Sequence, residues 1–315
     1  MARSLVQATA VVTLARREKG CLPEVSNIVV IDSGFGGLGV VAALDPSPGK
    51  GPGSLPEAPT LRITYINASP SDEVGFNQLP SHQHKVRTLE AVVARAIEKE
   101  QPAGVFIACN TLSVLLPDTR LASAVSVHGI PDVGARLLAD FLQQHPEHPV
   151  LLFGTQTTIS TDLYRQRVET LGQDPSRISQ VACPRLETLI SNDPTGASVL
   201  AAARDFAADG LGQMGHPPKL GVFLGCTHYG YRASVFRDVL SELGSEATVL
   251  NPNPAFAAHI RREVGAPFEA IAVRFLTPYV PPDGELANVP RLLDPLSATT
   301  AAAVRSFELD EGAAS

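Results

Sequence analysis

Two cysteines occupy equivalent positions in a repeated segment of the sequence. Residues 104–111 read GVFIACNT and residues 221–228 read GVFLGCTH, so that Cys109 and Cys226 each end an apolar run. A short apolar run that turns polar is typical of a buried parallel strand whose carboxyl end opens into a ligand site. The repeat therefore predicts two thiols that face one small molecule from two sides.

Paired thiols suit acid/base chemistry at the Cα atom of an amino acid. Inversion at Cα needs a base that removes a proton from one face and an acid that returns one to the other face. A thiol has an ordinary pKa of about 8.5, which a nearby helix N-terminus lowers. Because each cysteine is followed by residues that open a helix, we expect both thiols to be activated. Either cysteine alone would be better interpreted as a small buried apolar residue, and the repeat reverses that preference.

The composition points to a globular enzyme of two domains. The chain has 315 residues, of which 44% are hydrophobic, and a formal net charge of −7. That charge argues against a nucleic-acid surface, which requires clustered Lys and Arg. No apolar run reaches the roughly 18 residues that a membrane span needs. We therefore expect a soluble protein with no nucleic-acid or membrane partner, and the candidate assembly is a homodimer.

The chain has four cysteines, too few for a disulfide scaffold and without a C-x-x-C pair. A reducing cytoplasm is the expected location. Cys183 has no repeated strand of its own and is predicted to pack in a core or a loop, while Cys21 lies in an N-terminal extension.

From Asn27 onward, short β-rich runs alternate with helical periods, which predicts an α/β fold with parallel sheets. The clearest helix covers residues 83–99. The expected strands are 27–32, 61–67, 104–108, 124–128, 150–153, 178–182, 220–225 and 247–250.

The separation of the two cysteine strands predicts two α/β domains with the active site in the cleft between them. Residues 27–128 together with 232–300 are assigned to the first domain, and residues 129–231 to the second. Residues 1–26 are predicted to be an extension and residues 301–315 a flexible tail. Residues 45–59 are rich in Pro and Gly, which predicts a mobile surface loop.

A second polar turn follows the first predicted strand. Asp32 and Ser33 precede a glycine-rich stretch, GFGG, that opens a helix. The spacing differs from the G-x-G-x-x-G dinucleotide fingerprint and from the P-loop, so no nucleotide cofactor is expected. The turn offers a carboxylate, a hydroxyl and backbone N–H groups.

Five motifs follow one another along the chain: Asp32-Ser33-Gly34, Ala108-Cys109-Asn110-Thr111, Gly154-Thr155, Ala182-Cys183-Pro184 and Gly225-Cys226-Thr227-His228. In combination they resemble the cofactor-independent aspartate/glutamate racemases, closest to glutamate racemase. The resemblance covers roughly residues 27 to 260. It implies two pseudo-symmetric α/β domains and an isomerase that needs neither a metal nor another cofactor.

The resemblance also implies a role for each site residue. Cys109 and Cys226 would be the two acid/base groups, with Asp32 and His228 assisting one thiol each. The remaining residues, together with Asp32 and His228, would hold the amino-acid substrate: Ser33, Phe76, Asn77, Asn110, Thr111 and Thr227.

The sequence departs from the family pattern in two places. Phe76-Asn77 stands where the family places Tyr-Gly beside the substrate side chain, and carboxylates at Asp72 and Glu73 would repel an acidic substrate if they pointed inward. Ser191 stands where the family carries a glutamate. Glu187, four residues earlier, is the candidate replacement.

The leading hypothesis is interconversion of L- and D-glutamate, a peptidoglycan precursor in its D form. Aspartate, another amino acid or a hydantoin remains an alternative substrate within the same superfamily. A decarboxylase is less favoured because that chemistry needs one cysteine only. An alternative of a different class is a non-catalytic amino-acid-binding or inhibitory protein.

Overall fold

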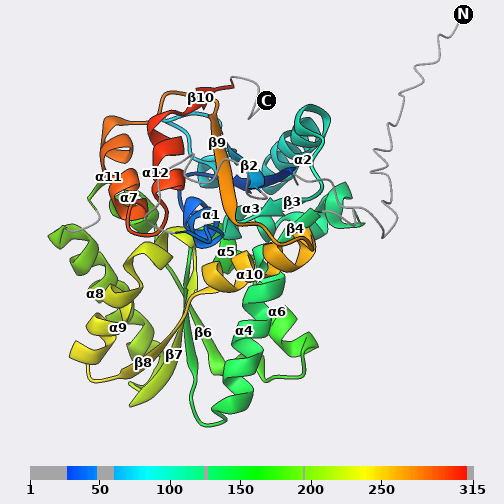
Figure 1. Cartoon of the computed structure of the whole chain (residues 1–315). Helices are drawn as coiled ribbons and strands as arrows, with labels where there is room; N and C mark the ends of the chain where they lie inside the picture. Colours follow the sequence, from blue (N-terminus) through cyan, green and yellow to red (C-terminus); the bar gives the residue numbers. More distant parts are fainter. Residues whose placement is uncertain (1–26, 48–59, 124–126, 194–195, 311–315) are drawn as a thin grey trace, which may run out of the picture.

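Two parallel sheets organise the chain (Figure 1). The computed structural model describes residues 27–47, 60–123, 127–193 and 196–310. The larger sheet has six strands in the order β10-β9-β2-β1-β3-β4, and the smaller has four in the order β6-β5-β7-β8. All their pairings are parallel. The predicted α/β class is therefore confirmed.

The larger sheet aligns the first thiol with the polar turn. Ile31 of β1 is in register with Ile107 of β3, so Asp32 and Cys109 leave the same edge of the sheet. The apolar side chains of β1 and β3 are buried on both faces, as expected for central parallel strands. The strands are β1 (Asn27–Asp32), β2 (Thr60–Asn67), β3 (Val105–Ile107), β4 (Val127–Gly129), β9 (Ala270–Thr277) and β10 (Glu308–Leu309).

The smaller sheet places the second thiol in the same way. Gly154 at the end of β5 is in register with Gly225 of β7, and Cys226 follows directly. The strands are β5 (Val150–Gly154), β6 (Ile178–Ala182), β7 (Lys219–Gly225) and β8 (Glu246–Leu250).

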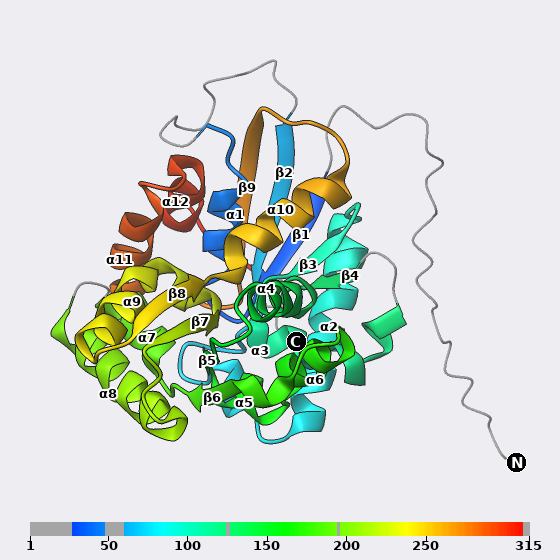
Figure 2. The ribbon, with the colours of Figure 1, turned by 90° about the horizontal axis from the view of Figure 1, so that it is seen from below.

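Helices cover both sheets (Figure 2). In α2 the apolar side chains recur at helical spacing and are buried, and Ser81 caps the helix by accepting a hydrogen bond from the His84 backbone N–H. The longer helices are α2 (His82–Glu100), α4 (Ile130–Gln144), α8 (Ala197–Met214), α9 (Ala233–Glu242), α10 (Pro252–Val264) and α11 (Asp283–Leu293). The shorter helices are α1 (Leu38–Ala43), α3 (Asn110–Ser113), α5 (Gln156–Ser160), α6 (Leu163–Thr170), α7 (Leu186–Asn192) and α12 (Ala298–Arg305). The 3₁₀ turns are η1 (Phe76–Gln78), η2 (Leu116–Asp118), η3 (Arg120–Ser123), η4 (Pro175–Arg177) and η5 (Thr227–Arg232).

Two predictions about the C-terminal third are wrong. The chain was expected to return to the first domain at residue 232, but β8 pairs with β7 in the smaller sheet, so the return follows β8. The predicted flexible tail at 301–315 contains the last five residues of α12, of which Ala301 and Val304 are buried, and β10, which pairs with β9. The predicted 1–26 extension, the end of the tail at 311–315 and most of the 45–59 loop lie outside the described residues.

Direct contacts join the two halves. Tyr231 of η5 donates a hydrogen bond to the carbonyl of Phe35 at 2.8 Å, and Lys85 of α2 donates one to Thr157 Oγ1 at 3.0 Å. A Cβ atom added at Gly36 would collide with Thr227 Oγ1 and would lie 2.7 Å from the His228 backbone nitrogen. Only glycine therefore lets the first turn approach the loop after Cys226 so closely. Among the described residues, no helix combines the length and apolarity required to cross a membrane.

Candidate active site

The first thiol lies at the start of α3. Cys109 is 5% exposed, and its Sγ atom is 3.1 Å from Ser33 Oγ. Ser33 is held in turn by Ser69, whose hydroxyl donates to the Ser33 carbonyl at 3.0 Å. The polar turn after β1 therefore positions a hydroxyl against the thiol at the end of β3.

The second thiol lies at the start of η5. Cys226 is 7% exposed, and its Sγ atom is 3.9 Å from His228 Nδ1. Asn253 of α10 donates a hydrogen bond to the carbonyl of Thr227 at 2.9 Å, and this bond holds the backbone between Cys226 and His228.

Asp32 connects the two sides. Its Oδ2 atom accepts a hydrogen bond from Thr227 Oγ1 at 3.0 Å. Burial raises the pKa of Asp32 to about 7, although hydrogen bonds from Thr227 and Cys109 partly oppose the shift. A carboxyl that changes charge near neutral pH, in contact with one thiol and with the residue beside the other, is suited to proton transfer.

The prediction that helix N-termini lower the pKa values of both thiols is wrong, because both values are raised. Burial raises the pKa of Cys109 to about 12, and the charge of Asp32 raises it further. Burial also raises the pKa of Cys226, with added contributions from the charges of Glu187 and Cys109. The helices that follow have too few turns to offset the loss of hydration. Both thiols are therefore protonated in this closed arrangement.

The groups beside Cys226 are a neutral imidazole and a partly buried carboxyl. Burial lowers the pKa of His228 to about 4, so the ring is uncharged at neutral pH and can accept a proton only when its surroundings change. Burial raises the pKa of Glu187, and its Oε2 atom has no hydrogen-bond partner among the described residues. Ser191 Oγ is buried and likewise lacks a partner there. The charge of Glu187 raises the pKa of Cys226, as does the more weakly acting charge of Asp32, so both carboxyl groups lie near this thiol.

The two residues after Cys109 are each hydrogen-bonded to a residue of the second half of the molecule. Thr111 Oγ1 is 2.8 Å from Thr155 Oγ1, and the hydroxyl of Tyr164 hydrogen-bonds to Asn110 Oδ1. Asn110 is 1% exposed, and its Nδ2 has no hydrogen-bond partner among the described residues. A buried, unpaired amide donor is costly and fits a ligand carboxylate.

The two residues predicted for the substrate side chain differ in placement. Phe76 is 2% exposed and packs in the apolar cluster that contains Cys109, so its ring is a core group. Asn77 is half-buried, and its Oδ1 has no partner among the described residues. Asp72 and Glu73 are exposed, which removes the repulsion that an inward orientation would cause.

Tyr164 is a site residue that sequence reasoning missed. It is 1% exposed, and the charges of Cys109 and Cys226 both raise its pKa beyond the effect of burial. The residue therefore lies close to both thiols. It lies near the start of α6 and outside the five motifs, so its sequence context gives no signal of this. Cys183, by contrast, is fully buried among apolar side chains, as predicted.

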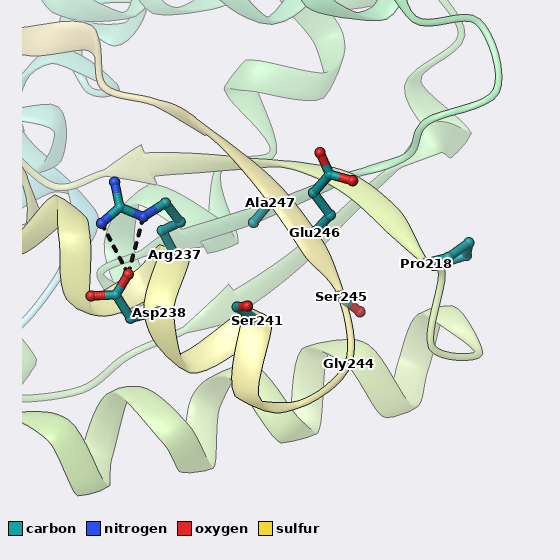
Figure 3. A pocket seen from close by; sticks show the side chains of 8 residues that line it. All are labelled: Pro218, Arg237, Asp238, Ser241, Gly244, Ser245, Glu246 and Ala247. Carbon is teal, nitrogen blue, oxygen red and sulfur yellow. Dashed lines mark hydrogen bonds and ion pairs between the residues drawn. The ribbon is translucent and has the colours of Figure 1, made fainter.

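A surface depression on the smaller sheet is remote from this chemistry (Figure 3). It lies at the amino ends of β7 and β8, whereas Cys226 follows the carboxyl end of β7. Arg237 and Asp238 form an ion pair at its edge. It is lined by Pro218, Arg237, Asp238, Ser241, Gly244, Ser245, Glu246 and Ala247.

Known proteins show the same combination of sequence and fold. Residues 58–260 match the family described as Asp/Glu/Hydantoin racemase. The chain is 28% identical over 225 residues to glutamate racemase from Lysinibacillus sphaericus, which covers 71% of this chain and 76% of that protein. It is 29% identical over 241 residues to glutamate racemase from Chlorobium phaeobacteroides, covering 75% and 79%.

Solved structures agree on the fold. The glutamate racemase isoform RacE1 from Bacillus anthracis superposes with a TM-score of 0.61 at 20% identity, covering 85% of this chain and 92% of that chain. Glutamate racemase from Francisella tularensis, in complex with D-glutamate, gives 0.60 at 18% identity, covering 86% and 94%.

Proposed function

The chain belongs to the Asp/Glu/Hydantoin racemase family, so it is a racemase, and we propose that it interconverts L- and D-glutamate with Cys109 and Cys226 as the two acid/base groups. One observation carries the proposal. The turn that holds Asp32 contacts the surroundings of both thiols, because Ser33 touches Cys109 and Asp32 accepts from Thr227 beside Cys226.

The two thiols divide the proton transfers between them. One cysteine, as thiolate, removes the proton from Cα, and the other, as thiol, delivers a proton to the opposite face. The product leaves with the roles of the cysteines exchanged, so the reverse reaction uses the same groups. Holding Cα between the two sulfurs supplies part of the rate enhancement through orientation.

Thiol ionisation needs a local acceptor because burial keeps both thiols protonated. Asp32, with a pKa of about 7, is the acceptor for the Cys109 proton. His228 and Glu187 serve Cys226. The ammonium group of a bound amino acid would favour each thiolate by placing a positive charge beside it.

Two observations support glutamate as the substrate: polar side chains that suit its carboxylates, and the names of the related proteins. Asn110 Nδ2 is an unpaired donor suited to the α-carboxylate, and Asn77 is the polar residue predicted at the side chain. The curated relatives named above are glutamate racemases. An acidic side chain is therefore the first choice, and Asn77 is the residue through which the preference is tested.

The direct test is a circular-dichroism assay of the purified protein with each enantiomer of the common amino acids. We expect L- and D-glutamate to lose optical activity and to take up deuterium at Cα in D₂O. Turnover of a neutral amino acid or a hydantoin with inert glutamate would overturn the substrate assignment. Absence of racemisation and of Cα exchange for every substrate would overturn the proposed activity.

A further inference from the structure

Three metal-ligating side chains meet away from the thiols. His128 of β4 and His259 and Glu263 of α10 can each offer one ligand atom such that the three atoms lie within 4.8 Å of one another. The side chains of His128 and His259 are 22% and 19% exposed, and that of Glu263 is 43% exposed. The cluster is thus anchored on its histidine side and open to solvent on its carboxylate side.

The histidine rings are held in place by aromatic neighbours. His128 stacks on Phe106 with ring centroids 5.0 Å apart, and His259 stacks on Phe256 at 5.9 Å. Glu263 follows His259 by one helical turn, and its carboxylate lies 3.7 Å from His259 Nδ1 and 4.0 Å from His128 Nε2. Packing therefore fixes both rings, while the exposed carboxylate is free to approach a ligand.

The separation of the facing nitrogens fits a shared cation. His128 Nδ1 and His259 Nε2 are 3.2 Å apart, whereas the distances of 4.0 and 3.7 Å from Glu263 run to the other nitrogen of each ring. The exposed carboxylate of Glu263 would therefore have to rotate toward this nitrogen pair to bind the same ion. Two imidazole nitrogens on one tetrahedral Zn²⁺ ion, each about 2.0–2.1 Å from the metal, are roughly 3.4 Å apart. At such a distance the two nitrogens share either a proton or a metal ion.

We propose that His128, His259 and Glu263 bind one divalent transition-metal ion of the Zn²⁺ class. Two imidazoles and one carboxylate favour Zn²⁺ or Co²⁺ over Mg²⁺ and Ca²⁺, which prefer ligand sets made of oxygen atoms. The exposed side of the cluster leaves room for water as a further ligand.

The electrostatics keep the rings in the form that binds metal. Burial lowers the pKa of His128, and Glu263 partly opposes that shift. Burial also lowers the pKa of His259, as do the charges of His128, Arg262 and Arg136, with Glu263 again opposing. The imidazoles are therefore neutral at neutral pH, as ligation requires. The two arginines also repel a cation, so we expect moderate affinity.

The ion would tie α10 to the larger sheet. This helix follows β8 of the smaller sheet and leads into β9 of the larger one. Its first turn carries Asn253, which holds the loop beside Cys226, and its last turns carry His259 and Glu263. A bound metal would thus fix the connection between the sheets without taking part in proton transfer.

The test titrates Zn²⁺ and Co²⁺ into the full chain carrying Cys109→Ser and Cys226→Ser, which removes thiol ligands at the active site. We expect saturation at one equivalent, a visible Co²⁺ spectrum without a thiolate charge-transfer band, and a higher Tm with Zn²⁺. His259→Gln in this background should abolish these three signals. Glu263→Gln, at an exposed position that folding tolerates, should weaken binding by at least about tenfold.

His148→Gln is the matched control, since His148 stacks on His145 with ring centroids 5.2 Å apart but lies outside the cluster. It should bind Zn²⁺ like its parent. Undiminished binding in either His259→Gln or Glu263→Gln, or no saturable binding in the parent, would overturn the proposal.

Discussion

Thr227 donates a hydrogen bond to Asp32 at 3.0 Å, although 195 positions separate the two residues in the sequence. Thr227 follows one catalytic candidate, Cys226, and Asp32 is hydrogen-bonded to the other, Cys109. The bond spans the two halves of the molecule. Asp32 is therefore connected to the surroundings of both thiols.

Replacing one thiol at a time distinguishes racemisation, which needs both cysteines, from reactions that need one base only. Cys109→Ser and Cys226→Ser should each lower the racemisation rate by about 10²–10⁴-fold, because a hydroxyl is a far weaker acid than a thiol. Each variant should still eliminate a leaving group from a β-substituted substrate analogue, a reaction that needs one base. Cys183→Ala, which removes a third buried thiol, is the control and should remain active. Near-full racemisation in either serine variant would exclude the two-thiol mechanism.

Asp32→Asn should make the stability of the folded protein less dependent on pH. The pKa of Asp32 rises from 3.8 to about 7 on folding, so the folded state holds the proton more tightly and its stability falls as pH rises between these values. Removing the buried charge should therefore stabilise the variant relative to the parent above pH 7, by up to about 4 kcal/mol, with little gain near pH 4. Urea unfolding at both pH values measures this difference. A difference that is the same at both pH values contradicts the assignment.

His228→Asn should slow proton transfer at Cys226 more than at Cys109. The enantiomers have equal free energies, so kcat/KM must fall equally in both directions, by about tenfold or more. The asymmetry appears instead in the primary deuterium isotope effect, which should increase for the enantiomer that Cys226 deprotonates. Glu187→Gln should act on the same enantiomer, because its charge acts on Cys226. Equal isotope effects for both enantiomers would remove His228 from this role.

Gly36→Ala should open the site. An added Cβ would collide with Thr227 Oγ1 and crowd the His228 backbone, so the two halves could not close. Activity should fall by at least about tenfold, because small displacements of reacting groups are costly. Gly34→Ala is the matched control, since its Cβ would meet His228 Cε1 at an ordinary 3.4 Å. Equal activity of the two variants would show that closure tolerates the extra carbon.

Asn77→Gly should change the preference between glutamate and shorter acids. The side chain of Asn77 narrows the space that the family pattern leaves open, and its buried Oδ1 lacks a partner among the described residues. Ratios of kcat/KM for glutamate and aspartate in parent and variant measure the effect. An unchanged ratio would place Asn77 outside the substrate side-chain pocket.

The sequence predicted what depends on local pattern. The bounds of β1 and β6 match the prediction, because polar residues follow the apolar run of β1, and β6 lies between the turn at Pro175–Arg177 and Cys183-Pro184. β9 was missed because its buried and exposed residues do not alternate regularly, and prolines follow it closely. Proline does not exclude a helix here, since Pro282 precedes α11 and Pro290 lies within it.

The candidate site was predictable in its residue types but not in its electrostatics. The repeat around Cys109 and Cys226 was visible in the sequence, whereas the depth of burial that raises both thiol pKa values depends on how the two halves close. Tyr164 was missed for the same reason, since its contact with Asn110 joins distant segments.

The position of β9 has a consequence for biosynthesis. This strand lies between β2 and β10 in the larger sheet, although it is made only after the whole smaller sheet has emerged. During synthesis, the smaller sheet can form before β9 is made, and the edge of β2 that pairs with β9 stays unpaired until then. A nascent chain released before β9 is complete at residue 277 would expose that edge to pairing with other chains.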